Sequence, residues 1–162
     1  MPTNEANGKD TSLKWDVFIT PGIPIITSTP APNTKVTFWH PISSTIIYGK
    51  HDAVLVDTFL TVEQSNDLVK WVAASGKNLT TIYITHGHGD HWFGTGALLS
   101  HFPNCRAVAT PDVVRSMRQL SSPEFIRNWN LQFPNQIPDK LVIADDLKGN
   151  KIELEGLDLL AL

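Results

Sequence analysis

Residues 85–94 read Thr-His-Gly-His-Gly-Asp-His-Trp-Phe-Gly, and the rest of the chain is organised around this stretch. It holds three histidines and one aspartate within six residues, at positions 86, 88, 90 and 91. An apolar run over residues 79–84 precedes it, which is typical of a buried strand. The cluster is therefore predicted to lie in the loop that leaves the carboxyl end of a strand, where sites on α/β sheets tend to lie.

The spacing of these side chains favours a metal centre. In near-extended chain, residues two apart point to the same side, so His86 and His88 can face one ion together. The glycines between them lack a Cβ, and a bend there lets Asp90 and His91 point to a second position nearby. Imidazole suits zinc or iron, and a carboxylate adds a harder oxygen ligand. Two metal ions about 3.5–4 Å apart can activate water and polarise a substrate. The alternative is a polar loop that caps the next helix, but so dense a cluster favours a metal or catalytic site.

The pattern His86-Gly-His88-Gly-Asp90-His91 resembles the His-x-His-x-Asp-His signature of the metallo-β-lactamase superfamily. Residues 44–49 and 53–58 are similar to the opening strands of that family, so the resemblance covers residues 35–110. It implies an α/β fold, the αββα sandwich, of which this chain would hold the N-terminal half to two-thirds. It also implies that His86 and His88 bind one Zn²⁺ ion and that Asp90 and His91 bind a second, with iron or manganese as other possible metals.

The chain departs from the family pattern after the motif. The family has three further ligands later in its chain, whereas the only histidine here after His91 is His101, within an expected helix. The motif alone offers two ligands to each ion, and catalytic zinc usually has three protein ligands plus water. Because the later ligands are missing, we expect residues 13–162 to form a C-terminally incomplete domain. The polar residues 1–12 are expected to be a disordered leader.

Four further expectations concern single residues near the motif. Asp90 is expected to act in catalysis by orienting the nucleophile. Asp57 ends an apolar strand, where it either caps a turn or orients a metal-bound histidine, and the resemblance favours the second role. Trp92 follows a ligand directly and is expected to line the substrate pocket, with core packing as the alternative. His40 precedes a proline at a strand end, where a structural role is favoured over a place in a cleft.

Periodicity and turn residues predict the remaining elements. Thr61 and Gln64 fit a capping box at the start of a helix, and Gly76 suits its C-terminal cap. A hairpin is expected between residues 141–143 and 152–154, and residues 157–162 are expected to form an exposed strand that could pair in a homodimer. Strands are predicted at 13–20, 36–40, 44–48, 53–56 and 106–109, and helices at 61–75, 96–101, 111–120 and from 123.

Composition narrows the class of protein. With 162 residues, of which 41% are hydrophobic and 18% charged, the chain fits one globular domain. A net charge of −3 gives no electrostatic reason to expect nucleic acid or an anionic membrane as partner. No segment approaches the roughly 20 apolar residues of a membrane helix, and the polar N-terminus lacks the apolar core of a secretory signal. A cytoplasmic location is the expectation.

These observations favour an enzyme, a zinc-dependent hydrolase that uses metal-activated water. Its substrate is expected to be a small, largely apolar ester, lactone, lactam or thioester, since fold and motif do not select among these. The alternative is a non-catalytic, truncated or degenerate half-domain that serves as a binding or structural module.

Overall fold

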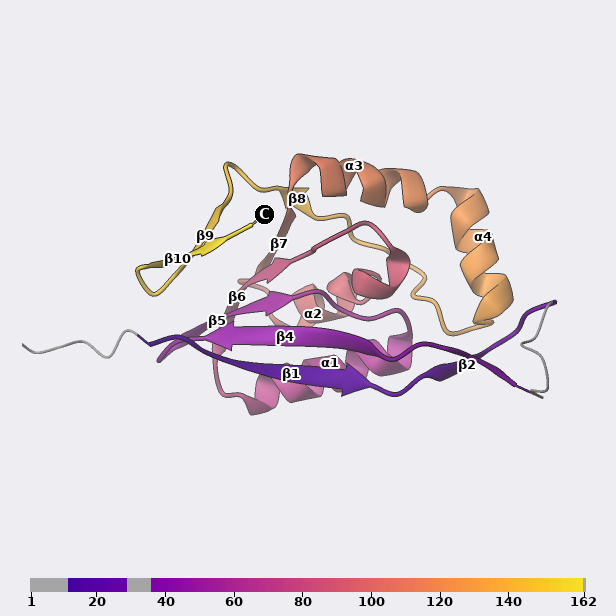
Figure 1. Cartoon of the computed structure of the whole chain (residues 1–162), viewed down its shortest axis with the longest axis horizontal. Helices are drawn as coiled ribbons and strands as arrows, with labels where there is room; N and C mark the ends of the chain where they lie inside the picture. Colours follow the sequence, from indigo (N-terminus) through magenta and orange to yellow (C-terminus); the bar gives the residue numbers. More distant parts are fainter. Residues whose placement is uncertain (1–11, 29–35, 162) are drawn as a thin grey trace, which may run out of the picture.

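A six-stranded sheet forms the centre of the molecule (Figure 1), in the computed structural model that describes residues 12–28 and 36–161. The predicted leader lies outside the described residues except for Ser12. Strand β4 runs antiparallel to its two neighbours β1 and β5, whereas β5, β6, β7 and β8 run parallel. In sheet order the strands are β1 (Lys14–Thr20), β4 (Ile42–Tyr48), β5 (Asp52–Val56), β6 (Asn78–Tyr83), β7 (Arg106–Ala109) and β8 (Asp145–Asp146).

Two helices cover one face of this sheet. Helix α1 (Val62–Ala74) begins with the predicted capping box between Thr61 and Gln64, and Gly76 follows it at a φ of +66°. Helix α2 (Thr95–His101) contacts α1. The main core lies between these helices and the sheet, because Leu68 and Leu98 are buried in one cluster with Ile46, Leu55 and Ile82.

The opposite face carries a smaller core under a second, two-stranded sheet. Strands β9 (Lys151–Leu154) and β10 (Leu157–Leu160) form a hairpin, and Ile152 of β9 packs with Val54 and Val108 of the main sheet. Towards β1 this face is open, and the side chains of Trp15 and Ile19 are 70% and 64% exposed. The second layer therefore covers only part of the main sheet.

The expected hairpin between residues 141–143 and 152–154 is wrong. Residues 141–144 form no strand, and the next two residues form β8, which pairs parallel with β7. Strand β9 pairs with β10 through a turn at Glu155 and Gly156, both of which have positive φ. A two-residue turn with positive φ at both positions suits the twist of a hairpin. Strand β9 is therefore the first strand of this hairpin, whereas the sequence predicted residues 152–154 as the second strand of an earlier one.

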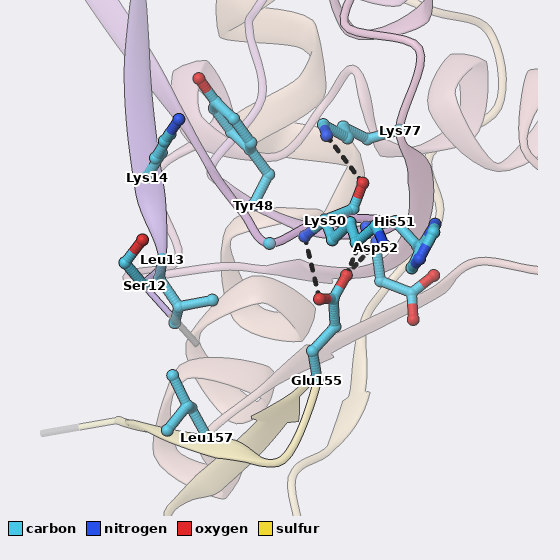
Figure 2. A pocket seen from close by; sticks show the side chains of 11 residues that line it. Ser12, Leu13, Lys14, Tyr48, Lys50, His51, Asp52, Lys77, Glu155 and Leu157 are labelled. Carbon is cyan, nitrogen blue, oxygen red and sulfur yellow. Dashed lines mark hydrogen bonds between the residues drawn. The ribbon is translucent and has the colours of Figure 1, made fainter. Parts of the chain in front are cut away.

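The side chain of Glu155 fastens this hairpin to the main sheet (Figure 2). Its carboxylate accepts hydrogen bonds from the backbone N–H groups of Asp52, His51 and Lys50, in the turn between β4 and β5. These three donors lower the pKa of Glu155 from 4.5 to about 2. The contact joins residues 103 to 105 positions apart in sequence.

The remaining elements gather at the other end of the sheet. Strands β2 (Ile23–Ile25) and β3 (Thr37–Trp39) form a hairpin, and the N–H of Ile26 donates to the carbonyl of Gln132 at the end of α4 (Figure 1). Helices α3 (Pro111–Leu120) and α4 (Pro123–Gln132) lie between β7 and β8 in the chain. Among the described residues, no helix combines the length and apolar character that crossing a bilayer requires.

Candidate metal centre

The motif lies where the sequence predicts, in the loop that follows β6. A 3₁₀ turn, η1 (Gly89–His91), contains its second half. Both glycines are needed for close packing as well as for bending. A Cβ on Gly87 would lie 2.4 Å from Ser116 Oγ on α3, and one on Gly89 would lie 2.5 Å from the ring of Phe93. The loop is thus pressed against its neighbours, which fixes the directions of its side chains.

Asp57, directly after β5, contacts both Thr85 and His91 of the motif loop. Its Oδ1 accepts from the backbone N–H of Thr85 at 2.8 Å, and its Oδ2 accepts from the hydroxyl of Thr85 at 2.7 Å. The same Oδ2 lies 2.9 Å from Nδ1 of His91. Asp57 therefore contacts a motif histidine and a backbone amide 28 residues away, which favours the orienting role over the capping of its own turn. It does so from a φ of +61°, a strained conformation for a residue with a side chain.

The hydrogen bonds set which nitrogen each histidine offers. Nδ1 of His91 faces a carboxylate, so in the neutral ring Nδ1 carries the proton and Nε2 keeps its lone pair. The single hydroxyl proton of Thr85 goes to Asp57, so Nδ1 of His86, 2.9 Å from that hydroxyl oxygen, is the donor there. Both rings thus present a free Nε2. A carboxylate or hydroxyl behind the imidazole is the usual support of a metal-binding histidine.

The two histidines differ in basicity. Burial, together with the nearby charge of His91, lowers the pKa of His86. Burial also acts against protonation of His91, but the hydrogen bond to Asp57 and the charge of Asp57 outweigh it, so the pKa of His91 is raised. His86 is therefore the more readily available ligand, and His91 must give up a more tightly held proton before it can bind an ion.

The donor set fits a divalent ion. Ligand atoms of Asp57, His86 and His91 all lie within 4.8 Å of one another. The ring of His88, which is exposed, lies 5.0 Å from that of His86, and the rings of His86 and His91 are 4.0 Å apart. Because the oxygens of Asp57 already accept three hydrogen bonds, we assign Asp57 to orientation and the imidazoles to ligation. Metal binding by the motif remains a prediction.

Asp90 is buried and faces two residues from the end of β3. The indole Nε1–H of Trp39 donates to its Oδ2 at 3.1 Å, and Nε2 of His40 lies 3.6 Å from the same oxygen. Nε2 of His91 lies 3.8 Å from the same oxygen. Sequence reasoning favoured a structural role for His40 and did not consider Trp39. No local pattern could have found them, because only the fold brings β3 beside a loop 50 residues later.

The structure corrects the expectation for Trp92. Its side chain is completely buried in the core and donates from Nε1 to the carbonyl of Gly87 at 2.9 Å. A large apolar ring gains more from the core than from a solvent-facing pocket wall, and here its single polar atom is paired as well. Trp92 therefore holds the motif loop in place from beneath.

A cavity of about 760 Å³ lies at the opposite end of the parallel strands (Figure 2). It is lined by Lys14, Tyr48, Lys77 and Glu155, among others, and by no motif residue. Lys77 Nζ is already engaged, since it donates to the carbonyl of Lys50 and lies over the ring of Tyr48. The large cavity and the histidine cluster therefore lie at different places. The histidine cluster is the better candidate for the functional site, because it holds the side chains that can bind a metal ion.

Fold and site together define the class, a mixed α/β protein with imidazoles and buried carboxylates at the carboxyl ends of adjacent parallel strands. The sequence pattern of the metallo-beta-lactamase superfamily matches residues 37–162. The chain belongs to that superfamily.

Relatives cover the chain in part. Hydroxyacylglutathione hydrolase of Francisella tularensis subsp. novicida (strain U112) is 33% identical over 64 residues, which are 40% of this chain and 24% of that protein. The enzyme of the same name from Francisella tularensis subsp. holarctica (strain LVS) gives the same values. The chain thus spans about a quarter of the length of these curated relatives.

Solved structures confirm the expected metallo-β-lactamase fold. The metallo-beta-lactamase SMB-1 superposes with a TM-score of 0.53 at 20% identity, over 72% of this chain and 44% of its own. The B3 metallo-beta-lactamase BLEG-1 gives 0.54 at 16% identity, over 88% and 59%. A metallo-beta-lactamase from Cronobacter sakazakii gives 0.54 at 20%, over 74% and 45%. At these identities the likeness concerns the fold alone.

Proposed function

We propose that this chain acts as a metal-dependent hydrolase with zinc as its ion. The observation that carries the proposal is the support behind His86 and His91. Asp57 contacts Nδ1 of His91, and Thr85 contacts Nδ1 of His86. The Nε2 atoms of both rings are therefore left to face an ion. A polar loop that only capped a helix would not need two histidines held in the same tautomer around one buried carboxylate. Membership of the superfamily supports the same conclusion.

In this proposal the residues divide the work. His86 and His88 would hold one ion, and Asp90 and His91 the second. A divalent ion bound there supplies Lewis acidity and an activated water molecule. Asp57 keeps the imidazoles oriented, and Asp90 orients the attacking water through a carboxylate oxygen. Trp92 and the packed glycines keep the loop rigid, so the ligands need little rearrangement before an ion binds.

For the substrate we propose a thioester of a small molecule. The support is the match to two relatives named hydroxyacylglutathione hydrolase. In such a reaction water adds to the thioester carbonyl, the C–S bond breaks, and a carboxylic acid and a thiol are released. Trp92 is in the core and cannot line an apolar substrate pocket.

The test combines metal content with turnover. The purified chain should contain zinc and should hydrolyse a thioester faster than a lactam of similar size. Replacing His88 or Asp90 by Ala should remove bound metal and turnover while the circular dichroism spectrum is kept. His101→Ala is the matched control, since His101 lies on α2 away from the motif. Unchanged zinc content in the first two variants would refute the proposed ligands. A chain that binds no metal and turns over nothing would instead be the non-catalytic module.

A further inference from the structure

One buried carboxylate of the centre is held by an aromatic side chain from a distant hairpin. Nε1 of Trp39 lies 3.1 Å from Oδ2 of Asp90, whose side chain is only 5% exposed. Trp39 ends β3, and Asp90 lies in η1, 51 residues later. We propose that Trp39 is a positioning residue, which fixes the carboxylate of Asp90 for metal binding. This inference rests on the ligand role of Asp90 in the proposed function.

The chemistry of an indole donor suits this task. A buried carboxylate needs a hydrogen-bond partner, and a Lys or Arg partner would neutralise the charge that attracts a cation. The indole N–H is neutral and does not titrate, so it satisfies one lone pair and leaves the negative charge of the ligand intact. The same oxygen also lies 3.6 Å from Nε2 of His40 and 3.8 Å from Nε2 of His91.

Within residues 12–28 and 36–161, the hydrogen bond that Asp90 accepts comes from Trp39 and goes to Oδ2. Trp39 thus anchors one oxygen of the Asp90 carboxylate and restricts the direction of that side chain. The motif residue enters metal binding with its direction already set.

Trp39 is itself held by packing. Its ring makes edge-to-face contacts with Trp129 of α4 and with Phe133, at centroid distances of 5.3 and 5.9 Å. Phe133 is completely buried. The hairpin β2–β3 and helix α4 therefore serve the centre indirectly, since they fix the indole that fixes Asp90.

The experiment compares two substitutions that each remove one indole N–H. Trp39→Phe loses the donor to Asp90, whereas Trp71→Phe loses the N–H of an indole on α1 that stacks on Phe18. Zinc and cobalt affinities are measured by competition with a chelator, and cobalt absorption reports the ligand geometry. For Trp39→Phe we expect affinity for one of two ions to fall by about tenfold or more, the usual cost of removing a group behind a ligand. Trp71→Phe should leave both affinities nearly unchanged, because Trp71 contacts neither Trp39 nor the motif in the described residues.

A second measurement needs no metal. In ¹⁵N spectra of the metal-free chain, the indole N–H of Trp39 should exchange slowly with solvent, and Asp90→Ala should make that exchange fast. Equal affinities for the two Phe variants, or an indole signal indifferent to Asp90→Ala, would overturn the positioning role. An unsubstituted chain that binds zinc without hydrolysing anything would refute the proposed function and leave this role intact. One that binds no ion would refute both.

Discussion

At the scale of single residues, Asp57 determines how the centre is arranged. Its carboxylate holds the backbone and hydroxyl of Thr85 and the ring of His91 at once. We predict that Asp57→Asn lowers zinc affinity by about 10- to 100-fold, because an amide neither accepts as strongly nor carries the charge. The pKa of His91 should also fall, since Asp57 is what raises it.

Chelator competition and histidine NMR titration of the metal-free chain measure these two effects. Asp67→Asn is the control, because Asp67 is a carboxylate on α1 that pairs only with exposed Lys70. A variant at position 57 that keeps both the zinc affinity and the pKa of His91 would show that Asp57 serves the backbone alone.

Sequence alone identified the residues that sit within one short stretch. The spacing of His86, His88, Asp90 and His91 was informative because loop residues close in sequence must be close in space. Trp39 could not be found, since its contact with Asp90 depends on how β3 is placed by the fold. Trp92 was misjudged because sequence shows that a large aromatic is present but not which side of the loop it packs against.

At the scale of elements, the start of α1 offers a direct test of capping. Thr61 Oγ1 accepts from the backbone N–H of Gln64 at 3.2 Å, and the side chain of Gln64 accepts from the N–H of Thr61. We predict that Thr61→Ala lowers the free energy of unfolding by about 1 kcal/mol. Urea denaturation of Thr61→Ala beside Thr110→Ala provides the measurement. Thr110 is the N-cap of α3 but its side chain makes no cap bond, so its loss should cost less. Equal losses would contradict the reciprocal cap.

Helices and central strands were well predicted because their signals are local. The capping box, the glycine after α1 and the prolines at the starts of α3 and α4 all mark boundaries seen in the structure. The last hairpin was misassigned because residues 141–143 and 152–154 both carry apolar side chains and flank a polar stretch with Gly149 that resembles a turn. The turn at Glu155 and Gly156 decides which strand pairs with residues 152–154. Both residues have positive φ, and a Glu in the sequence does not indicate such a conformation.

At the scale of the whole molecule, Glu155 joins the two layers. Its pKa in the folded chain is about 2, below the ordinary 4.5, so the carboxylate stabilises the fold above pH 4.5. That contribution is lost as the pH falls from 4.5 through 2. We predict that Glu155→Gln lowers the Tm at pH 7 and that the difference from the unsubstituted chain shrinks steadily as the pH falls towards 3. Scanning calorimetry at several pH values checks this, with Glu153→Gln as control, since Glu153 is an exposed residue of β9. A difference that did not change with pH would rule out a charge effect.

The partly covered sheet predicts self-association. Trp15 pairs with Ile47 and so faces the same side as the smaller core, yet Trp15 and Ile19 remain mostly exposed. Strand β1 is also an edge of the main sheet, and exposed apolar edges favour pairing. We expect a mass in solution that rises with concentration.

Light scattering distinguishes two surfaces for this contact. Replacing both Trp15 and Ile19 by Lys should give a monomer if the open face of β1 is used. Leu160→Lys should do so if the C-terminal strand β10 is used, where Leu160 is 59% exposed. A monomer at all concentrations in the unsubstituted chain would contradict both.

The Glu155 contact also sets an order of events in folding. It joins segments 103 residues apart, so the chain must close a long loop before the carboxylate meets its three donors. We expect this contact to form after the rate-limiting step, because its three donors are in place only once β4, β5 and their turn have formed. Glu155→Ala should then leave the refolding rate nearly unchanged and speed unfolding, which a stopped-flow chevron would show as a shift of one limb only. The Glu155 carboxylate would thus slow unfolding. The lifetime of the folded molecule would then depend on a residue far from the metal centre.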